Sequence, residues 1–157
     1  MQVFVPYENH IATAEVLDNK RLFKQLVEGK QILLALDDPS YGWQNHPATK
    51  MFRGYDLALV EYLFVLAEEW RNRGRDRVTG LPYEESVSEW LDANYNIQNG
   101  VTLPPWWGGP IHASHRFKLF WKNPQHYGPI FYGEEWPRCV LEEEPPYYWP
   151  TTERLII

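Results

Sequence analysis

Apolar residues recur with a helical repeat in four segments of the chain, which are joined by connections rich in proline and glycine. In residues 9–35 they return at three- and four-residue steps, the periodicity of an amphipathic helix, and Asn9 is suited to cap its N-terminus. Similar repeats predict helices over residues 48–73, 84–97 and 112–122. Strand-like alternation is confined to residues 3–5, so the pattern predicts an all-α fold.

The connections divide the helices without dividing the chain into domains. The last predicted helix should end before Pro124, because the residue that precedes a proline disfavours helical geometry. After Pro124 we expect an irregular C-terminal segment rich in aromatic residues and proline. A chain of 157 residues without repeats or a low-complexity linker is the size of one compact core. We therefore expect a single helical domain over residues 1–157.

One side of the first predicted helix is polar where a helix packed in a core would be apolar. At about 100° per residue these side chains fall along one face. The polar stripe consists of Asp18, Arg21, Lys24, Gln25 and Glu28. Taken alone, such a stripe favours a solvated face held by ion pairs, and a catalytic face is the alternative.

Charge and cysteine content restrict the setting in which the protein works. The formal net charge of −6 argues weakly against nucleic acid as a partner, because DNA binding depends on cations that neutralise phosphates. The single cysteine, Cys139, excludes an intramolecular disulfide, and neither a leader nor a membrane-length apolar run is evident. We expect a monomer that acts in the cytoplasm, of a cell or of a phage's host, without membrane contact.

Polar residues at the entrances to the second and fourth predicted helices could bind phosphates, because the N-terminus of a helix attracts anions. The predicted DNA-backbone contacts are Asn45, His46, Lys50, Arg53, His112, Ser114, His115, Arg116 and Lys122. The alternative for His46 is a capping role, and for His112 and His115 it is hydrogen bonding to local carbonyls. A metal site at these two histidines would need a third ligand that the spacing does not offer, and we expect no metal or cofactor.

Aromatic residues make up 16% of the chain and gather in its second half. Most of them should anchor the core and loops. Stacking on a flipped base is the functional alternative. The residues predicted to line a base pocket are Trp106, Trp107, Tyr148 and Trp149.

Four stretches that cover the chain from end to end resemble the bacterial and phage branch of the pyrimidine-dimer DNA glycosylase (phage endonuclease V) family. They are "LDNKRLFKQLVEGKQIL", "GWQNHPATKMFRGY", "HASHRFKLFWKNPQHYGP" and "YYWP". The resemblance implies an all-helical domain that bends double-stranded DNA, flips a base and cleaves its glycosidic bond. It further implies an N-terminal α-amine as nucleophile, a glutamate on the first long helix, and a Schiff base at C1′ that permits strand cleavage by β-elimination.

Transfer of these roles to the present sequence places the nucleophilic residue at Met1, since Gln2 is too large for ordinary methionine removal. An α-amine suits this chemistry, because α-amines are partly neutral at physiological pH whereas lysine amines are not. Arg21 coincides with a family arginine, but Leu22 stands at the position of the catalytic glutamate. Glu28 is the best replacement, with Asp18 second, and Lys24 is a third candidate as an alternative amine.

The sequence thus predicts a DNA glycosylase that excises a damaged or modified pyrimidine, with AP-lyase activity through the N-terminal amine left open. The predicted catalytic residues are Met1, Asp18, Arg21, Lys24, Gln25 and Glu28. Two alternatives stay open. One is an inert DNA-binding or interaction module on the same scaffold, and the other is an N-glycosidase for free nucleotides.

Overall fold

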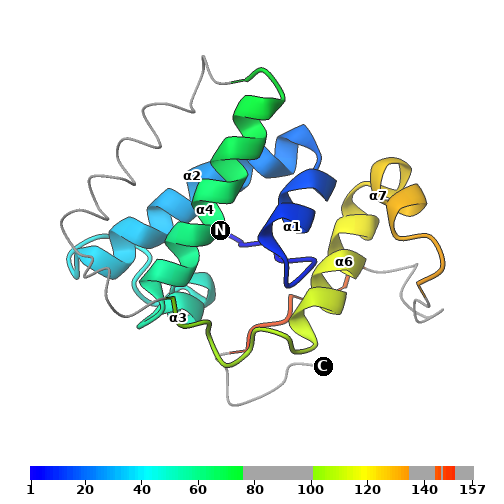
Figure 1. The fold of residues 1–157 in the computed structure, drawn as a ribbon. Helices are drawn as coiled ribbons and strands as arrows, with labels where there is room; N and C mark the ends of the chain where they lie inside the picture. Colours follow the sequence, from blue (N-terminus) through cyan, green and yellow to red (C-terminus); the bar gives the residue numbers. More distant parts are fainter. Residues whose placement is uncertain (76–100, 135–143, 146, 151–157) are drawn as a thin grey trace.

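A computed structural model describes residues 1–75, 101–134, 144–145 and 147–150. Within these residues the chain forms helices and no strand, which confirms the predicted all-α class (Figure 1). The helix predicted over residues 84–97 lies outside the described residues. The helices are α1 (His10–Val16), α2 (Asn19–Asp37), α3 (Pro47–Phe52), α4 (Asp56–Asn72), α6 (Ile111–Lys122) and α7 (Pro124–Ile130). None of those helices is both long and apolar enough to cross a membrane.

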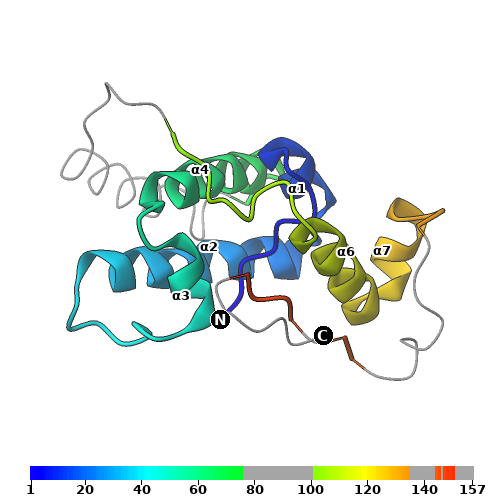
Figure 2. The same cartoon turned by 90° about the horizontal axis from the view of Figure 1, so that it is seen from below.

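The core is built around the contact between α2 and α4, and α1 and α3 both pack against α4. Gly29 of α2 allows the close approach, because a Cβ atom at this position would overlap the side chain of Leu63 on α4. Helices α6 and α7 pack together, and the first residues of the chain run between α6 and α2 (Figure 2). The fold therefore brings the N-terminus to the polar face of α2.

The first predicted helix is in fact two helices, because the chain is extended at Leu17 and Asp18. Asn9 caps α1 as predicted, accepting a hydrogen bond from the Ala12 amide at 2.9 Å. Asp18 caps α2. Arg73, at the end of α4, donates to the Leu17 carbonyl at 2.7 Å and to carbonyls in the last turn of α1. The break is stable because Leu17 is fully buried and these carbonyls find partners outside the helix.

The second predicted helix also divides, into α3 and α4. Gly54 separates them with φ of +82°, a conformation that L side chains rarely adopt and that favours glycine. At the entrance to α3 the His46 ring accepts a hydrogen bond from the Ala48 amide at 3.1 Å, and Pro47 is the first helical residue. This is the capping role that the sequence offered as an alternative for His46.

The prediction of an irregular chain after Pro124 was wrong for residues 124–130, which form α7. Asn123 caps α7 by accepting a hydrogen bond from the His126 amide at 3.3 Å, and Pro124 occupies the first helical position. Proline is favoured there, since its fixed φ suits the helix and its missing N–H would have no partner. The same proline that ends α6 therefore begins α7.

Candidate active site

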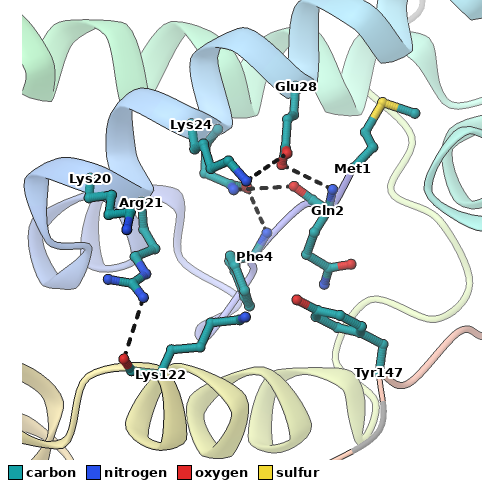
Figure 3. A pocket seen from close by; sticks show the side chains of 10 residues that line it. Met1, Gln2, Phe4, Lys20, Arg21, Lys24, Glu28, Lys122 and Tyr147 are labelled. Carbon is teal, nitrogen blue, oxygen red and sulfur yellow. Dashed lines mark hydrogen bonds and ion pairs between the residues drawn. The ribbon is translucent and has the colours of Figure 1, made fainter.

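A pocket of about 270 Å³ opens where α2, α6 and the C-terminal segment meet the first residues of the chain (Figure 3). Its lining residues are Met1, Gln2, Phe4, Lys20, Arg21, Lys24, Gln25, Glu28, Lys122 and Tyr147. Every predicted catalytic residue except Asp18 lies in this set. The polar stripe of α2 thus forms one wall of a pocket. It also contains two ion pairs, Arg21 with Asp18 and Lys24 with Glu28, of the kind expected for a solvated face.

Glu28 joins that wall to the beginning of the chain. One carboxylate oxygen accepts a hydrogen bond from the Gln2 amide at 3.0 Å, and the other lies 3.4 Å from the Lys24 ammonium. The Glu28 side chain is only 14% exposed, whereas that of Lys24 is 64% exposed. The carboxylate is therefore held in place by the residue next to Met1, while Lys24 reaches toward solvent.

The side chain of Gln25, one turn before Glu28, holds the same segment from inside the protein. Its amide oxygen accepts from the Phe4 amide at 2.7 Å and from the Tyr62 hydroxyl at 3.2 Å, and its amide nitrogen donates to the Gln2 carbonyl at 3.2 Å. Tyr62 also donates to the Phe4 carbonyl at 2.7 Å. Gln25 and Tyr62 are both buried. Gln25 is thus a positioning residue for the N-terminal segment, residues 1–6.

Helix α6 holds the N-terminal segment from the other side. The Val5 amide donates to Nδ1 of His115 at 3.0 Å, and Nδ1 of His112 lies 2.7 Å from the Val5 carbonyl. Arg116 donates to the Pro6 carbonyl at 2.7 Å. Burial, together with the charge of His112, lowers the pKa of His115 to about 3. His115 is therefore a neutral hydrogen-bond acceptor at physiological pH.

Arg21 lines the pocket, and Asp18, which does not line it, lies beside Arg21. Asp18 accepts from the Arg21 guanidinium at 3.2 Å and from the Tyr127 hydroxyl at 2.8 Å, in addition to capping α2. Burial raises the pKa of Tyr127, so its hydroxyl stays a donor. The other terminal nitrogen of Arg21, Nη2, donates to the Lys122 carbonyl at 3.5 Å. Asp18 is committed to this network, whereas Arg21 faces the pocket.

The pocket is cationic although the protein as a whole is acidic. Four cations, Lys20, Arg21, Lys24 and Lys122, line it, and among the described residues of the lining Glu28 is the one acidic residue. At its edge, partial burial lowers the pKa of His46, the positive N-terminus lowers it further, and Glu28 opposes the shift. The lining thus holds more cations than carboxylates, although Asp18 pairs with Arg21 and Glu144 with Lys122 beside it, and this arrangement suits an anionic ligand.

A sequence model described as pyrimidine dimer DNA glycosylase matches residues 1–81, just over half of the chain. The chain belongs to this family. No curated protein and no solved structure gives a significant match. The match spans the whole α2 wall of the pocket and the N-terminal segment that crosses it, so the pocket lies mainly in the part of the chain that the family model matches.

The DNA contacts predicted from the sequence differ in their exposure. Asn45, Lys50 and Arg53 are exposed around α3, and Lys122 lines the pocket. Ser114 is half-buried, and Arg116 pairs with Glu134. His112 and His115 are 6% and 0% exposed. The structure therefore contradicts a role for these two histidines on the DNA surface, because both rings bind the N-terminal segment.

The predicted base-pocket residues also separate. Trp106 donates to the Met51 carbonyl at 3.1 Å and Trp107 to the Glu8 carbonyl at 3.2 Å, and neither lines the pocket. Both therefore anchor loops, the role that the sequence analysis expected for most of the aromatic residues, and they lie outside this lining. Trp149 packs at 5.5 Å against the ring of Tyr147, while Tyr148 packs on the core.

Two residues were not predicted as part of the site. Tyr147, from the described part of the C-terminal segment, lines the pocket, and Lys118 holds this segment in place. Lys118 is almost fully buried, lies 4.1 Å from the centre of the Tyr147 ring, and donates to the Pro145 carbonyl at 2.6 Å. It also pairs with Glu144 and lowers the pKa of that carboxyl. A lysine at a buried position of the α6 repeat was the signal that could have revealed this anchor.

Proposed function

We propose that this family member excises a damaged or modified pyrimidine from double-stranded DNA, with the α-amine of Met1 as nucleophile and Glu28 as the proton-transferring carboxylate. The observation that carries the proposal is the hydrogen bond between Glu28 and the Gln2 amide. It fixes a carboxylate beside the beginning of the chain inside a cationic pocket, as seen in Figure 3. The target is a pyrimidine dimer or another altered pyrimidine.

The chemistry follows from these two groups. The neutral amine attacks C1′ of the target nucleotide as the C1′–N bond breaks, and the bonding electrons leave with the base, which takes up a proton. Glu28 then accepts a proton from the new ammonium and returns it to O4′ as the sugar ring opens, which leaves a Schiff base. Water can hydrolyse the Schiff base and restore the amine. Alternatively, loss of a C2′ proton expels the 3′-phosphate by β-elimination.

The cations of the pocket have a separate task. DNA phosphates flank the target nucleotide on both sides, and Lys20, Arg21, Lys24 and Lys122 supply positive charge around the carboxylate. Cationic side chains bind phosphates and position the duplex without reading its sequence. Arg21 is the most constrained of them, since Asp18 fixes one of its nitrogens.

Borohydride trapping tests the proposed nucleophile. Duplexes with a cyclobutane dimer, a modified pyrimidine or an abasic site are incubated with the full chain and borohydride, and the mass of the adduct is mapped to a peptide. We expect an adduct on Met1. A chain extended by two residues before Met1 should lose the adduct while it retains DNA binding, and intact mass must confirm each N-terminus.

The other outcomes discriminate between the alternatives. Base release without an adduct, with strand breaks only after alkali, would replace the amine by water activated at Glu28. Release of base from free nucleotides alone would instead indicate an N-glycosidase that does not act on DNA. Binding of every duplex without reaction would overturn the proposal in favour of an inert DNA-binding module.

A further inference from the structure

The loop between α2 and α3 (Figure 2) presents Trp43 in an unusual way. The Trp43 backbone has a φ of +71°, and its side chain is 51% exposed. Among the described residues it is the one non-glycine residue with positive φ. Bulky residues adopt this region at a cost, and such strain clusters at functional sites. The neighbouring Gly42 could adopt it freely but is not among the positive-φ residues.

The loop on either side of Trp43 is fixed. The Trp43 carbonyl accepts a hydrogen bond from the His46 amide at 3.0 Å. The Gln44 side chain donates to the Asp38 carbonyl at 2.8 Å, and Arg53 donates to the Gln44 carbonyl at 2.8 Å. A half-exposed tryptophan is thus held on a rigid support, which reduces the conformational entropy lost when its ring contacts a ligand.

A series of rings connects Trp43 with the pocket. The Trp43 ring lies 5.6 Å from the ring of His46, which lies 5.8 Å from that of Trp149. Trp149 in turn lies 5.5 Å from Tyr147, a lining residue of the pocket. The exposed Lys50 and Arg53 of the same region carry positive charge. The exposed ring therefore stands at the outer end of an aromatic series that begins at the cationic pocket.

We infer that Trp43 inserts into the duplex beside the extruded nucleotide and stacks on the base that the extrusion leaves exposed. The inference rests on the proposed function, because extrusion of a base is what creates the gap. A base offers a flat π face to an aromatic ring, and apolar side chains are known to wedge between base steps. Trp43 would then stabilise the bent, opened DNA while the target nucleotide enters the pocket.

The test uses a duplex with a tetrahydrofuran abasic analogue and 2-aminopurine opposite it, so that no bond is cleaved. Stacking quenches 2-aminopurine, and wild-type protein should lower its fluorescence. Trp43→Gly should abolish the quenching and weaken binding of this duplex by about 5–150-fold, the range for one stacked base. Trp43→Phe should retain both. Affinity for the intact duplex should change by less than about twofold.

Two controls keep this result separate from a structural effect and from the proposed chemistry. Trp43→Gly relieves the positive φ, so its Tm should equal or exceed that of wild type, and Tyr132→Ala, at an exposed aromatic distant in sequence, should leave quenching unchanged. Glu28→Gln should quench like wild type. The inference would be overturned if Trp43→Gly still quenched the fluorescence or if wild type did not quench it. It would also be overturned if Trp43→Gly lost affinity equally for both duplexes and had a lower Tm. Failure of excision with Trp43-dependent quenching intact would overturn the proposed chemistry alone.

Discussion

Helices α2 and α6 face the N-terminal segment from opposite sides, and both present polar side chains to it. On the α2 side, Glu28 holds the Gln2 amide and remains at the wall of a pocket. On the α6 side, His112 and His115 hold Val5 and are enclosed by protein. The sequence offered both groups as functional residues, and they differ in whether a ligand can reach them.

Side chains from α2 and α6, rather than a partner strand, fix the N-terminal segment. The N–H and C=O groups of a buried extended segment must find partners, and here side chains provide them from both helices. Buried residues can bind tightly because no ligand competes for them, whereas Glu28 must hold one amide and keep access to the pocket. Position within this cradle, which is formed by Gln25, Glu28, His112 and His115, thus separates residues that only hold the segment from Glu28, which also faces the pocket.

Replacement of Glu28 by glutamine should give the largest effect on turnover. The amide oxygen can still accept the Gln2 hydrogen bond, but it cannot transfer protons, so excision should fall by about 10²–10⁴-fold. DNA affinity and Tm should remain close to wild type. Single-turnover excision assays measure the loss, with Glu68→Gln on the exposed side of α4 as the matched control. Equal activity of the two variants would remove Glu28 from the mechanism.

Replacement of Gln25 by leucine should mainly lower stability. Leucine is similar in size, but the Phe4 amide and the Gln2 carbonyl lose their Gln25 partner, whereas the Tyr62 hydroxyl keeps the Phe4 carbonyl. An unsatisfied buried polar group costs about 1–3 kcal/mol, so the free energy of unfolding should fall by at least about 2 kcal/mol. Denaturant unfolding measures this change, and Gln31→Leu, which is half-buried on the same helix, is the control. Unchanged stability would mean that the cradle does not hold the segment.

His115 makes the α6 half of the cradle sensitive to acid. Its pKa is about 3 in the folded protein, whereas a histidine in the unfolded chain titrates near 6.5. Between these values the unfolded state binds more protons, so stability is complete above about pH 6.5 and falls as the pH drops toward 3. At pH 5 the loss should be about 2 kcal/mol. Burial also lowers the pKa of His10 and His46, which adds a smaller slope of the same sign.

Unfolding curves between pH 7 and pH 4 isolate the contribution of His115. His115→Gln retains an acceptor for the Val5 amide but removes the titration, so its stability should depend less steeply on pH than that of wild type. The two proteins should converge as the pH falls. Parallel pH profiles would show that His115 can take up a proton without loss of the fold.

The sequence was sufficient to predict the fold class and the polar face of α2 that lines the pocket. A helical repeat is a local property, and the polar stripe interrupts it at the positions that meet Met1 and Gln2. The breaks at Leu17 and at Gly54 were not predicted from the repeat, because apolar residues recur at helical spacing on both sides of each break. The first depends on Arg73, which is distant in sequence and supplies donors to the last turn of α1.

The roles of His112, His115 and Trp106 were not predictable for a related reason. Whether a polar or aromatic side chain is buried depends on which segment covers it. Here the N-terminal segment covers the two histidines, and Trp106 packs against α3, where the Met51 carbonyl accepts its indole N–H. Tyr147 enters the pocket because the buried Lys118 holds the segment around it. Long-range contacts of this kind leave no periodic signal in the sequence.

Lys24 should give the smallest change in stability and a separate change in DNA binding. It pairs with Glu28 at 3.4 Å but is 64% exposed, and exposed pairs of this kind contribute about 0.3–0.5 kcal/mol. If Lys24 binds a phosphate, Lys24→Gln should lower the slope of log affinity against log salt by about 0.9. Lys30→Gln, at an exposed lysine of α2 that does not line the pocket, should leave the slope unchanged. Equal slopes for both variants would show that Lys24 does not bind a DNA phosphate and is only a surface partner of Glu28.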